Sequence, residues 1–222
     1  MTPRLSLVHL IRPPTSPVAV PPLLVLLHGV GSHEGDLMGL APYLDDRFFL
    51  VSARAPLMFA PGMYGWFEVQ LDPDNPVINP EQAEASRETL IRFLRELPDA
   101  YGTDPRRMYL MGFSQGAIMS LSVLLTRPDL VAGVVAMSGR ILPEVLPRAA
   151  APKAMSGIPV LVVHGLADPI LPIHFGRAVR DQLSRLPVDL TYREYAMGHQ
   201  VTEESLAAVT AWLRARLDTP TR

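Results

Sequence analysis

The most informative segment of the sequence reads Met108-Tyr109-Leu110-Met111-Gly112-Phe113-Ser114-Gln115-Gly116-Ala117. A short apolar run, typical of a buried strand, leads into Gly-x-Ser-x-Gly, and the start of an apolar helix follows. In that context the motif predicts a sharp, strained turn that leaves the Ser114 hydroxyl exposed at the end of the strand. Gly112 and Gly116 leave room for the backbone and the helix to pass close by. On the five motif residues alone, a serine that caps the helix fits equally well.

Strand patterns and helix patterns alternate along the whole chain of 222 residues. Such an alternation predicts a single α/β domain over residues 1–222, with a mostly parallel central sheet and helices on both faces. A long aromatic-rich loop is expected over residues 53–79, and loops of that length are often functional. Pro98 is expected to end the second long helix. The expected strands are 5–11, 23–27, 48–51, 108–113, 131–137, 159–163 and 190–195, and the expected helices are 34–44, 80–97, 115–125, 173–186 and 202–217.

The composition excludes several classes of function. The formal net charge is −2, with acids and bases mixed along the chain, so no basic stripe predicts binding to nucleic acid or to a membrane surface. The absence of cysteine excludes a disulfide framework, a thiolate metal site and a cysteine nucleophile. The N-terminus lacks the apolar run of a signal peptide, and no apolar run is long enough to span a bilayer. We therefore expect a cytoplasmic protein without membrane insertion.

Polar residues that suit catalysis follow the expected strands that end at Leu27, Phe113, Val163 and Tyr195. The carboxyl ends of parallel strands share one edge of the sheet, and ligands bind at that edge. Ser114 comes directly after the second of these strands. A serine hydroxyl is a weak nucleophile at neutral pH, so it needs a base within hydrogen-bond reach and a third group that fixes the tautomer of the base.

Histidine suits the role of the base because its ordinary pKa lies near neutral pH. Hydrolases with a serine on a strand-turn-helix motif carry their residues in the order serine, acid, histidine. Of the six histidines, only His174 and His199 follow a suitable acid downstream of Ser114. His174 falls in the opening turn of an expected helix, which is typical of a surface residue, whereas His199 lies in a loop after a late strand. We therefore predict that His199 is the base.

Asp168 is the predicted orienting acid, because it lies in the loop after the expected strand 159–163. The alternative interpretation is a turn aspartate before Pro169, since Asp-Pro is a common turn pair. The catalytic interpretation is favoured once Ser114 and His199 are assigned. The other acids considered downstream of the serine suit helix ends, loops or surface positions: Asp129, Glu144, Asp181 and Asp189.

The tetrahedral intermediate of acyl transfer needs two hydrogen-bond donors aimed at its oxyanion. The backbone N–H of Gln115, directly after the nucleophile, is one predicted donor. The other is the N–H of Val30, in the loop His28-Gly29-Val30-Gly31 that follows an early strand. We expect the side chain of His28 to form its hydrogen bonds within this loop.

Several motifs in the right order resemble the phospholipase/carboxylesterase family of α/β-hydrolases, which includes small bacterial carboxylesterases and acyl-protein thioesterases. The likeness covers nearly the whole chain. It implies an α/β-hydrolase fold with Ser114, Asp168 and His199 as the catalytic triad, in agreement with the reasoning from the residues. The matching segments are Leu27-His28-Gly29-Val30-Gly31, Gly112-Phe113-Ser114-Gln115-Gly116, Met137-Ser138-Gly139 with Leu142-Pro143, His164-Gly165-x-x-Asp168-Pro169 and Gly198-His199.

The segment Tyr64-Gly65-Trp66-Phe67 resembles the aromatic stretch that borders the acyl site of this family. The resemblance implies Trp66, Phe67 and Met63 as residues that bind the acyl group, and packing in the core is their alternative role. Many members carry an aspartate directly after the His-Gly-x-Gly loop, but here four residues precede Asp36. This departure favours a general esterase over the thioesterase branch.

The sequence therefore predicts a serine carboxylic-ester hydrolase that acts on small or medium acyl esters through a Ser-His-Asp triad and an acyl-enzyme. The alternatives are an acyl thioesterase or lysophospholipase with the same machinery, or a non-catalytic binding protein on the same fold. This chemistry needs no cofactor, and a metal site at His28, His33 and Asp36 would lack further clear ligands. Homodimers are common among the relatives that the chain resembles, so a homodimer is a possible assembly.

Overall fold

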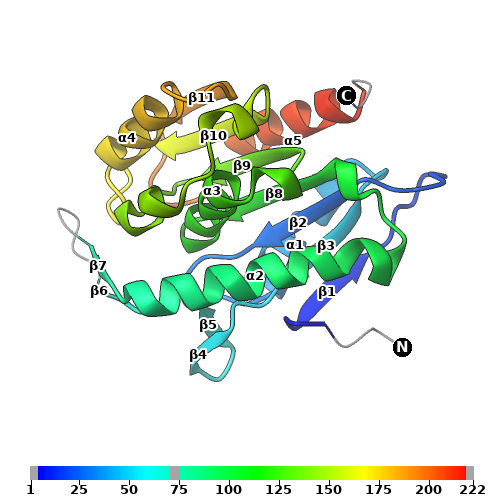
Figure 1. The fold of residues 1–222 in the computed structure, drawn as a ribbon, viewed down its shortest axis with the longest axis horizontal. Coiled ribbons are helices and arrows are strands. Elements are labelled where there is room, and N and C mark those ends of the chain that lie inside the picture. Colours follow the sequence, from blue (N-terminus) through cyan, green and yellow to red (C-terminus); the bar gives the residue numbers. More distant parts are fainter. Residues whose placement is uncertain (1–4, 71–75, 219–222) are drawn as a thin grey trace.

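A seven-stranded sheet forms the centre of the molecule in a computed structural model, which describes residues 5–70 and 76–218 (Figure 1). Its strands lie in the order β1-β3-β2-β8-β9-β10-β11. β1 pairs antiparallel with β3, and every other neighbouring pair is parallel, which confirms the predicted mostly parallel sheet. The strands are β1 (His9–Arg12), β2 (Leu23–Leu27), β3 (Phe49–Ala53), β8 (Met108–Phe113), β9 (Gly133–Met137), β10 (Pro159–Gly165) and β11 (Asp189–Tyr195).

Helices cover both faces of the sheet, as the alternating pattern predicts (Figure 1). α2, α3 and α4 pack on one face and contribute to one apolar core, whereas α1 and α5 contribute to the core on the other face. The helices are α1 (Gly35–Met38), α2 (Pro80–Tyr101), α3 (Gln115–Thr126), α4 (Ile173–Leu183) and α5 (Glu203–Leu217), and the 3-10 turns are η1 (Ala41–Tyr43), η2 (Pro105–Arg107), η3 (Pro128–Leu130), η4 (Pro143–Arg148) and η5 (Pro152–Met155).

The two cores explain why β2 has no polar residue. Leu23, Val25 and Leu27 face the core under α2 and α3, while Leu24 and Leu26 face the other core. Successive side chains of a strand point to opposite faces, so a strand covered on both faces must be apolar throughout. This packing fixes the strand ends that carry the polar loops along one edge.

The predicted end of the helix at Pro98 is wrong, because α2 continues past this proline. Its first turn is capped by the side chain of Asn79, which accepts from the N–H of Gln82. It ends at Tyr101 and is capped by Gly102, whose φ of 63° lies in the left-handed region and whose N–H donates to the carbonyl oxygen of Pro98. Pro98 removes only its own N–H from the helical pattern, and the buried side chains of Leu94 and Leu97 hold the helix against the sheet.

The predicted helix over residues 34–44 is also wrong in extent. The structure has only the four residues of α1, followed by the 3-10 turn η1. Gly39 follows α1 directly, and Pro42 in η1 has no N–H to continue an α-helical pattern. Leu37, Leu40 and Leu44 have the spacing of one helical face, but Gly39 and Pro42 between them interrupt the helix.

The expected loop over residues 53–79 contains two small hairpins, and residues 71–75 within it lie outside the described part. The hairpins are β4 (Leu57–Ala60) with β5 (Met63–Gly65), and β6 (Val69–Gln70) with β7 (Val77–Ile78). The β4–β5 hairpin projects from the body of the molecule (Figure 1). It carries the exposed apolar side chains of Met58, Phe59 and Met63.

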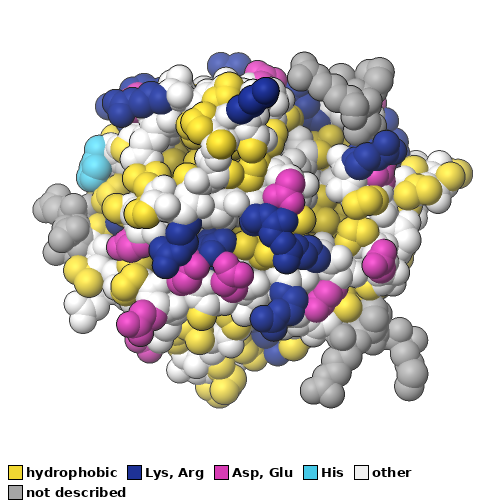
Figure 2. Space-filling model, in the orientation of Figure 1, with side chains coloured by type: hydrophobic (Ala, Val, Ile, Leu, Met, Phe, Trp, Pro, Cys, Tyr) yellow, Lys and Arg dark blue, Asp and Glu magenta, His cyan; other side chains and the backbone are white. Residues whose placement is uncertain are grey.

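The visible face over α2 carries basic and acidic side chains side by side (Figure 2). The same mixture is present in the sequence of the helix, which alternates glutamates with arginines. Within residues 5–70 and 76–218, no helix combines the length and the apolar character needed to cross a membrane.

Candidate active site

Ser114 lies at the turn between β8 and α3 in a strained backbone conformation. Its φ is 54° and its ψ is −118°, a combination that residues with a side chain rarely adopt. A Cβ atom on Gly116 would lie 1.8 Å from the carbonyl oxygen of Leu27, and one on Gly112 would lie 2.2 Å from that of Gly116. Only glycine fits at either position, so these two residues allow β2, β8 and α3 to meet beneath the serine.

Two hydrogen bonds connect side chains from distant parts of the chain at this turn. His199, in the loop after β11, places its Nε2 2.9 Å from the Oγ of Ser114. Its Nδ1 lies 2.7 Å from the Oδ2 of Asp168, in the loop after β10. The structure thus brings together the predicted nucleophile, base and acid. His174, the alternative base, is exposed in the first turn of α4.

The side chain of Asp168 is fully buried and accepts several hydrogen bonds. Its Oδ1 accepts from the backbone N–H groups of Ile170 at 2.9 Å and of Leu171 at 2.8 Å, while Oδ2 faces His199. Burial raises the pKa of Asp168, but the hydrogen bonds from His199 and from the two backbone groups outweigh it and hold the pKa below its ordinary value. The carboxylate is therefore charged at neutral pH and suited to orient an imidazole.

The loops that carry this acid and this base are in direct contact. The N–H of Ala167 donates to the carbonyl oxygen of Met197 at 3.1 Å. A Cβ atom on Gly165 would lie 2.4 Å from the carbonyl oxygens of both Met197 and Gly198. Gly165 therefore permits the close approach that places Asp168 beside the imidazole.

His164, at the end of β10, is a buried second imidazole whose role the sequence did not reveal. Its Nε2 donates to the carbonyl oxygen of Leu171 at 2.7 Å and lies 3.7 Å from the Oδ2 of Asp168. Burial lowers the pKa of His164, which keeps the ring neutral. A Cβ atom on Gly176 would lie 2.6 Å from the ring, so the helix α4 packs directly on it. The bond from His164 to Leu171 thus holds the turn whose backbone N–H groups donate to Asp168.

Two backbone N–H groups beside Ser114 have no acceptor in the described part of the chain, namely those of Val30 and Gln115. Gln115 begins α3, where the first N–H groups of a helix lack intrahelical partners. In the other loop, the N–H of Gly31 donates to the carbonyl oxygen of Tyr64 at 2.8 Å, while that of Val30 is left unused. These are the two groups that the sequence predicts as oxyanion donors.

His28 supports this loop from within, in the structural role expected from the sequence. Its Nε2 accepts from the N–H of Ala55 at 3.0 Å, so the proton resides on Nδ1, which donates to the carbonyl oxygen of Gly29 at 2.7 Å. Burial lowers the pKa of His28 and keeps it neutral. Both ring nitrogens are thereby used. Among residues 5–70 and 76–218, no three His, Asp or Glu side chains are grouped to hold a metal ion.

The side chain of Gln115 ties the aromatic segment to the nucleophile turn, a contact that the sequence did not reveal. Its Oε1 accepts from the N–H of Trp66 at 2.9 Å, and its Nε2 donates to the carbonyl oxygen of Phe67 at 2.8 Å. The indole of Trp66 is fully buried and donates to the carbonyl oxygen of His28 at 3.0 Å. The side chain of Met63, by contrast, is nearly half exposed, at 47%.

A small, mainly apolar pocket opens beside Ser114. Phe67 is part of its lining, whereas Trp66 and Met63 are not. Val30 and Gln115, which carry the unused N–H groups, also line it, and Arg140 is the one charged residue among the described lining residues. The remaining lining residues are Val69, Pro76, Ile78, Ile118, Ile170 and Leu171.

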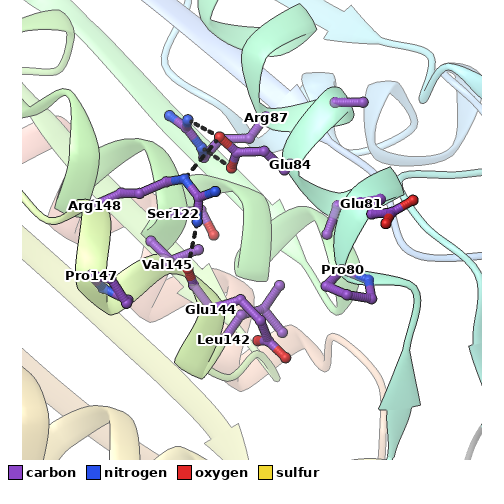
Figure 3. Close-up of a pocket in the computed structure, with 12 residues that line it drawn as sticks. Pro80, Glu81, Glu84, Arg87, Ser122, Leu142, Glu144, Val145, Pro147 and Arg148 are labelled. Carbon is purple, nitrogen blue, oxygen red and sulfur yellow. Dashed lines mark hydrogen bonds and ion pairs between the residues drawn. The ribbon is translucent and has the colours of Figure 1, made fainter.

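A larger hollow of about 640 Å³ lies between α2, α3 and η4 and shares no lining residue with the pocket at Ser114 (Figure 3). Glu84, Arg87 and Arg148 are the charged lining residues that form ion pairs. Glu84 bonds Arg87 at 2.7 Å and Arg148 at 3.2 Å, and Arg87 also donates to the hydroxyl of Thr126 at 3.0 Å. This ion-pair network links α2 to η4 and engages both arginines of the hollow.

The central parallel sheet, the strained serine turn and the three loops at the same edge define an α/β-hydrolase. A model of the phospholipase/carboxylesterase family matches residues 11–217, so the chain belongs to this family. It is an enzyme of the serine hydrolase class, and its family hydrolyses esters or thioesters.

Individual relatives are named as thioesterases or esterases. The chain is 33% identical to acyl-protein thioesterase 1 of Gibberella zeae over 163 residues, which cover 70% of this chain and 69% of the relative. It is 28% identical to esterase YpfH of Escherichia coli, over 86% of this chain and 82% of the relative. The crystal structure of esterase PE8 superposes with a TM-score of 0.83 at 32% identity and covers 94% of this chain and 98% of that protein.

Proposed function

We propose that this chain hydrolyses carboxylic esters of small or medium acyl groups through Ser114, His199 and Asp168. The single observation that carries this proposal is the pair of hydrogen bonds that His199 forms, 2.9 Å to Ser114 and 2.7 Å to Asp168. Nε2 of His199 takes the hydroxyl proton as Oγ attacks the acyl carbonyl carbon. Asp168, charged and buried, holds the other ring nitrogen protonated and stabilises the imidazolium that forms.

The tetrahedral intermediate places its negative oxygen at the unused N–H groups of Val30 and Gln115. When it collapses, His199 gives its proton to the departing alcohol, and the acyl group stays on the Oγ of Ser114. A water molecule then loses a proton to His199 and attacks the acyl-enzyme, which releases the carboxylic acid and restores the serine. Each step is assigned to a residue of the chain, so the proposed mechanism employs no cofactor.

In the proposed complex, the pocket beside Ser114 holds the acyl group. Phe67 is the aromatic residue assigned to contact it. Trp66 is assigned a supporting role, because it is bonded to Gln115 and His28 and does not line the pocket. Met63 is assigned to the mouth of the site, since its methyl group would lie 3.6 Å from a Cβ atom on Gly31.

A second candidate function is thioester hydrolysis by the same residues. It is favoured by the 33% identity to a protein named acyl-protein thioesterase 1. The test is a comparison of kcat/KM for an aryl ester, an acyl thioester and a lysophospholipid of equal acyl length. We expect the ester to be the best substrate and Ser114→Ala to remove the activity. A thioester or a lysophospholipid favoured by more than about tenfold would replace the ester as the assigned substrate.

A further inference from the structure

Arg140 reaches the pocket at Ser114 from a second strained turn, at the end of β9. Among the described residues, Ser114 and Ser138 are the two non-glycine residues with positive φ, and that of Ser138 is 49°. A Cβ atom on Gly139 would lie 2.6 Å from the Cβ of Ala117 in α3, so the turn is packed against the helix behind the nucleophile. Strained backbone of this kind persists only where surrounding contacts enforce it, and it is frequent at functional sites.

The guanidinium of Arg140 has little to neutralise it. Its Nη2 donates to the carbonyl oxygen of Pro76 at 3.0 Å, and its central carbon lies 5.6 Å from the centre of the Phe175 ring. Within the described residues no carboxylate forms an ion pair with it, and Glu144 acts on it only from a distance. The side chain is half-buried, and this burial lowers the pKa of Arg140. An arginine has five N–H donors, and within the described residues only one, on Nη2 of Arg140, has a protein acceptor, which leaves the others for a ligand.

The pocket that Arg140 lines is on the acyl side of the reaction. Its lining includes Ser114 and the two predicted oxyanion donors but not His199. In the proposed mechanism the leaving group departs toward His199, which protonates it. The pocket must therefore hold the acyl part of the substrate, with its far end toward Arg140.

We propose that Arg140 selects substrates whose acyl group ends in a carboxylate, that is, half-esters or half-thioesters of short dicarboxylic acids. The inference rests on the proposed ester hydrolysis at Ser114 and adds to it the class of acyl group. A carboxylate matches the planar fork of a guanidinium. A neutral acyl chain in the pocket would cover the half-buried guanidinium of Arg140 without supplying a counter-charge.

The test uses three ethyl esters of matched shape: monoethyl glutarate, ethyl 4-carbamoylbutanoate and ethyl pentanoate. The second replaces the carboxylate by a neutral amide, and the third replaces it by a methyl group. Release of ethanol gives kcat/KM for each ester. We expect the wild type to prefer the carboxylate over the amide by about 10- to 100-fold, the usual worth of a hydrogen-bonded charge pair. A ratio of 1 or less, with Ser114-dependent hydrolysis of the neutral esters, would overturn the proposal and leave the proposed function intact.

Variants of Arg140 test whether this residue is the source of the carboxylate preference. Arg140→Gln is expected to reduce the carboxylate-to-amide ratio to about 1, and Arg140→Lys to retain part of it, because it keeps the charge and loses the fork. Arg148→Gln, a paired arginine of the larger hollow, is the matched control and is expected to keep the ratio of the wild type. Loss of the ratio in this control but not in Arg140→Gln would contradict the assignment. If Arg140→Gln does not fold, the carboxylate-to-amide ratios of the wild type and of Arg140→Lys still test the proposal.

One further variant tests whether acids of the chain itself neutralise the arginine. Asp72 and Asp74 precede Pro76 in the sequence and lie outside the described residues. The double variant Asp72→Asn with Asp74→Asn is expected to keep the carboxylate preference. A carboxylate preference that appeared only in this double variant would overturn the proposal. If the wild type hydrolysed none of the three esters in a Ser114-dependent way, both this proposal and the proposed function would be refuted.

Discussion

The two hollows along α3 differ in how many of their polar groups already have hydrogen-bond or ion-pair partners. The larger one, between α2, α3 and η4, has a closed network in which Glu84 pairs with Arg87 and Arg148. The smaller one, at Ser114, has two unused backbone donors, a strained serine and a cation without an ion-pair partner in the described chain. Size alone would favour the larger hollow. Unused donors and backbone strain favour the smaller one as the site of the proposed chemistry.

The two hollows should therefore respond differently to substitution. Changes at the smaller pocket are expected to remove activity while the fold remains. Changes in the larger hollow are expected to lower stability while activity remains. The first of these effects is the larger one.

The largest expected effect comes from the serines of the two hollows. Ser114→Ala removes the nucleophile and is expected to lower kcat by about 10⁶-fold. Ser122→Ala is the matched change in the larger hollow. The Ser122 hydroxyl donates a hydrogen bond to the carbonyl oxygen of Ile118 in the preceding turn of α3, at 2.7 Å. It is expected to leave kcat within about twofold of the wild type, since an exchange of this kind usually has a small effect. Ester hydrolysis by both purified variants tests this contrast, which equal losses would refute.

Asp168→Asn is expected to lower kcat by about 10⁴-fold with little change in fold. The amide would donate to Nδ1 of His199 and leave the proton on Nε2, so the ring could no longer accept the proton of Ser114. Retention of more than a tenth of the wild-type kcat would show that the acid lies elsewhere.

The same variant has a predicted pH signature in stability. Folding lowers the pKa of Asp168, so the ionised carboxylate stabilises the folded state of the wild type. This stabilisation is fully present above the ordinary carboxyl pKa of about 3.9. It is lost as the pH falls through the lower pKa that Asp168 has in the folded protein. The free energy of unfolding of the wild type, relative to Asp168→Asn, should decrease between about pH 5 and pH 3. A difference that grows on acidification would contradict the direction of the pKa shift.

Gly116→Ala is expected to destabilise the fold by about 3 kcal/mol or more, because its Cβ would overlap the carbonyl oxygen of Leu27. Gly198→Ala is the control within the same site, since the nearest atom to its Cβ would be 3.8 Å away. We expect that control to change the free energy of unfolding by less than about 1 kcal/mol. Denaturant unfolding of both variants measures the contrast, and similar losses would mean that close packing at Gly116 is not what shapes the turn.

The smallest expected effect is in the larger hollow. Glu84→Gln weakens the pairing of Arg87, which keeps its bonds to Glu88 and Thr126, so the loss of stability should be about 1 kcal/mol. The value of kcat/KM should stay within about twofold of the wild type. A tenfold loss of activity without a loss of stability would place this hollow in the catalytic machinery.

The sequence predicted the features that depend on local pattern. The apolar runs identified the strands of the sheet, and the glycines around Ser114 identified the turn, because each signal lies within a few residues of its effect. The order of serine, acid and histidine then selected Asp168 and His199, which the structure places in contact. The homodimer and the cytoplasmic location remain predictions from the sequence.

The features that the sequence did not predict depend on partners far along the chain. The side chain of Gln115 was not predicted to hold Trp66 and Phe67, since 48 or more positions separate them. Arg140 was not singled out from the sequence, because the strained turn at Ser138 that precedes it is visible only in the structure. His164 was visible as a histidine four residues before Asp168, and this spacing at the end of a buried strand is the signal that could have revealed it.

Reaction of the folded protein with a fluorophosphonate, followed by peptide mass mapping, tests the proposed nucleophile most directly. Such a probe phosphonylates a serine only where a base activates it and oxyanion donors receive the developing charge. We predict one adduct per chain, on Ser114, abolished in Ser114→Ala and strongly reduced when His199 is replaced by alanine. An adduct on another serine, such as Ser122 or Ser138, or no adduct on the folded wild type, would contradict the assignment of this site.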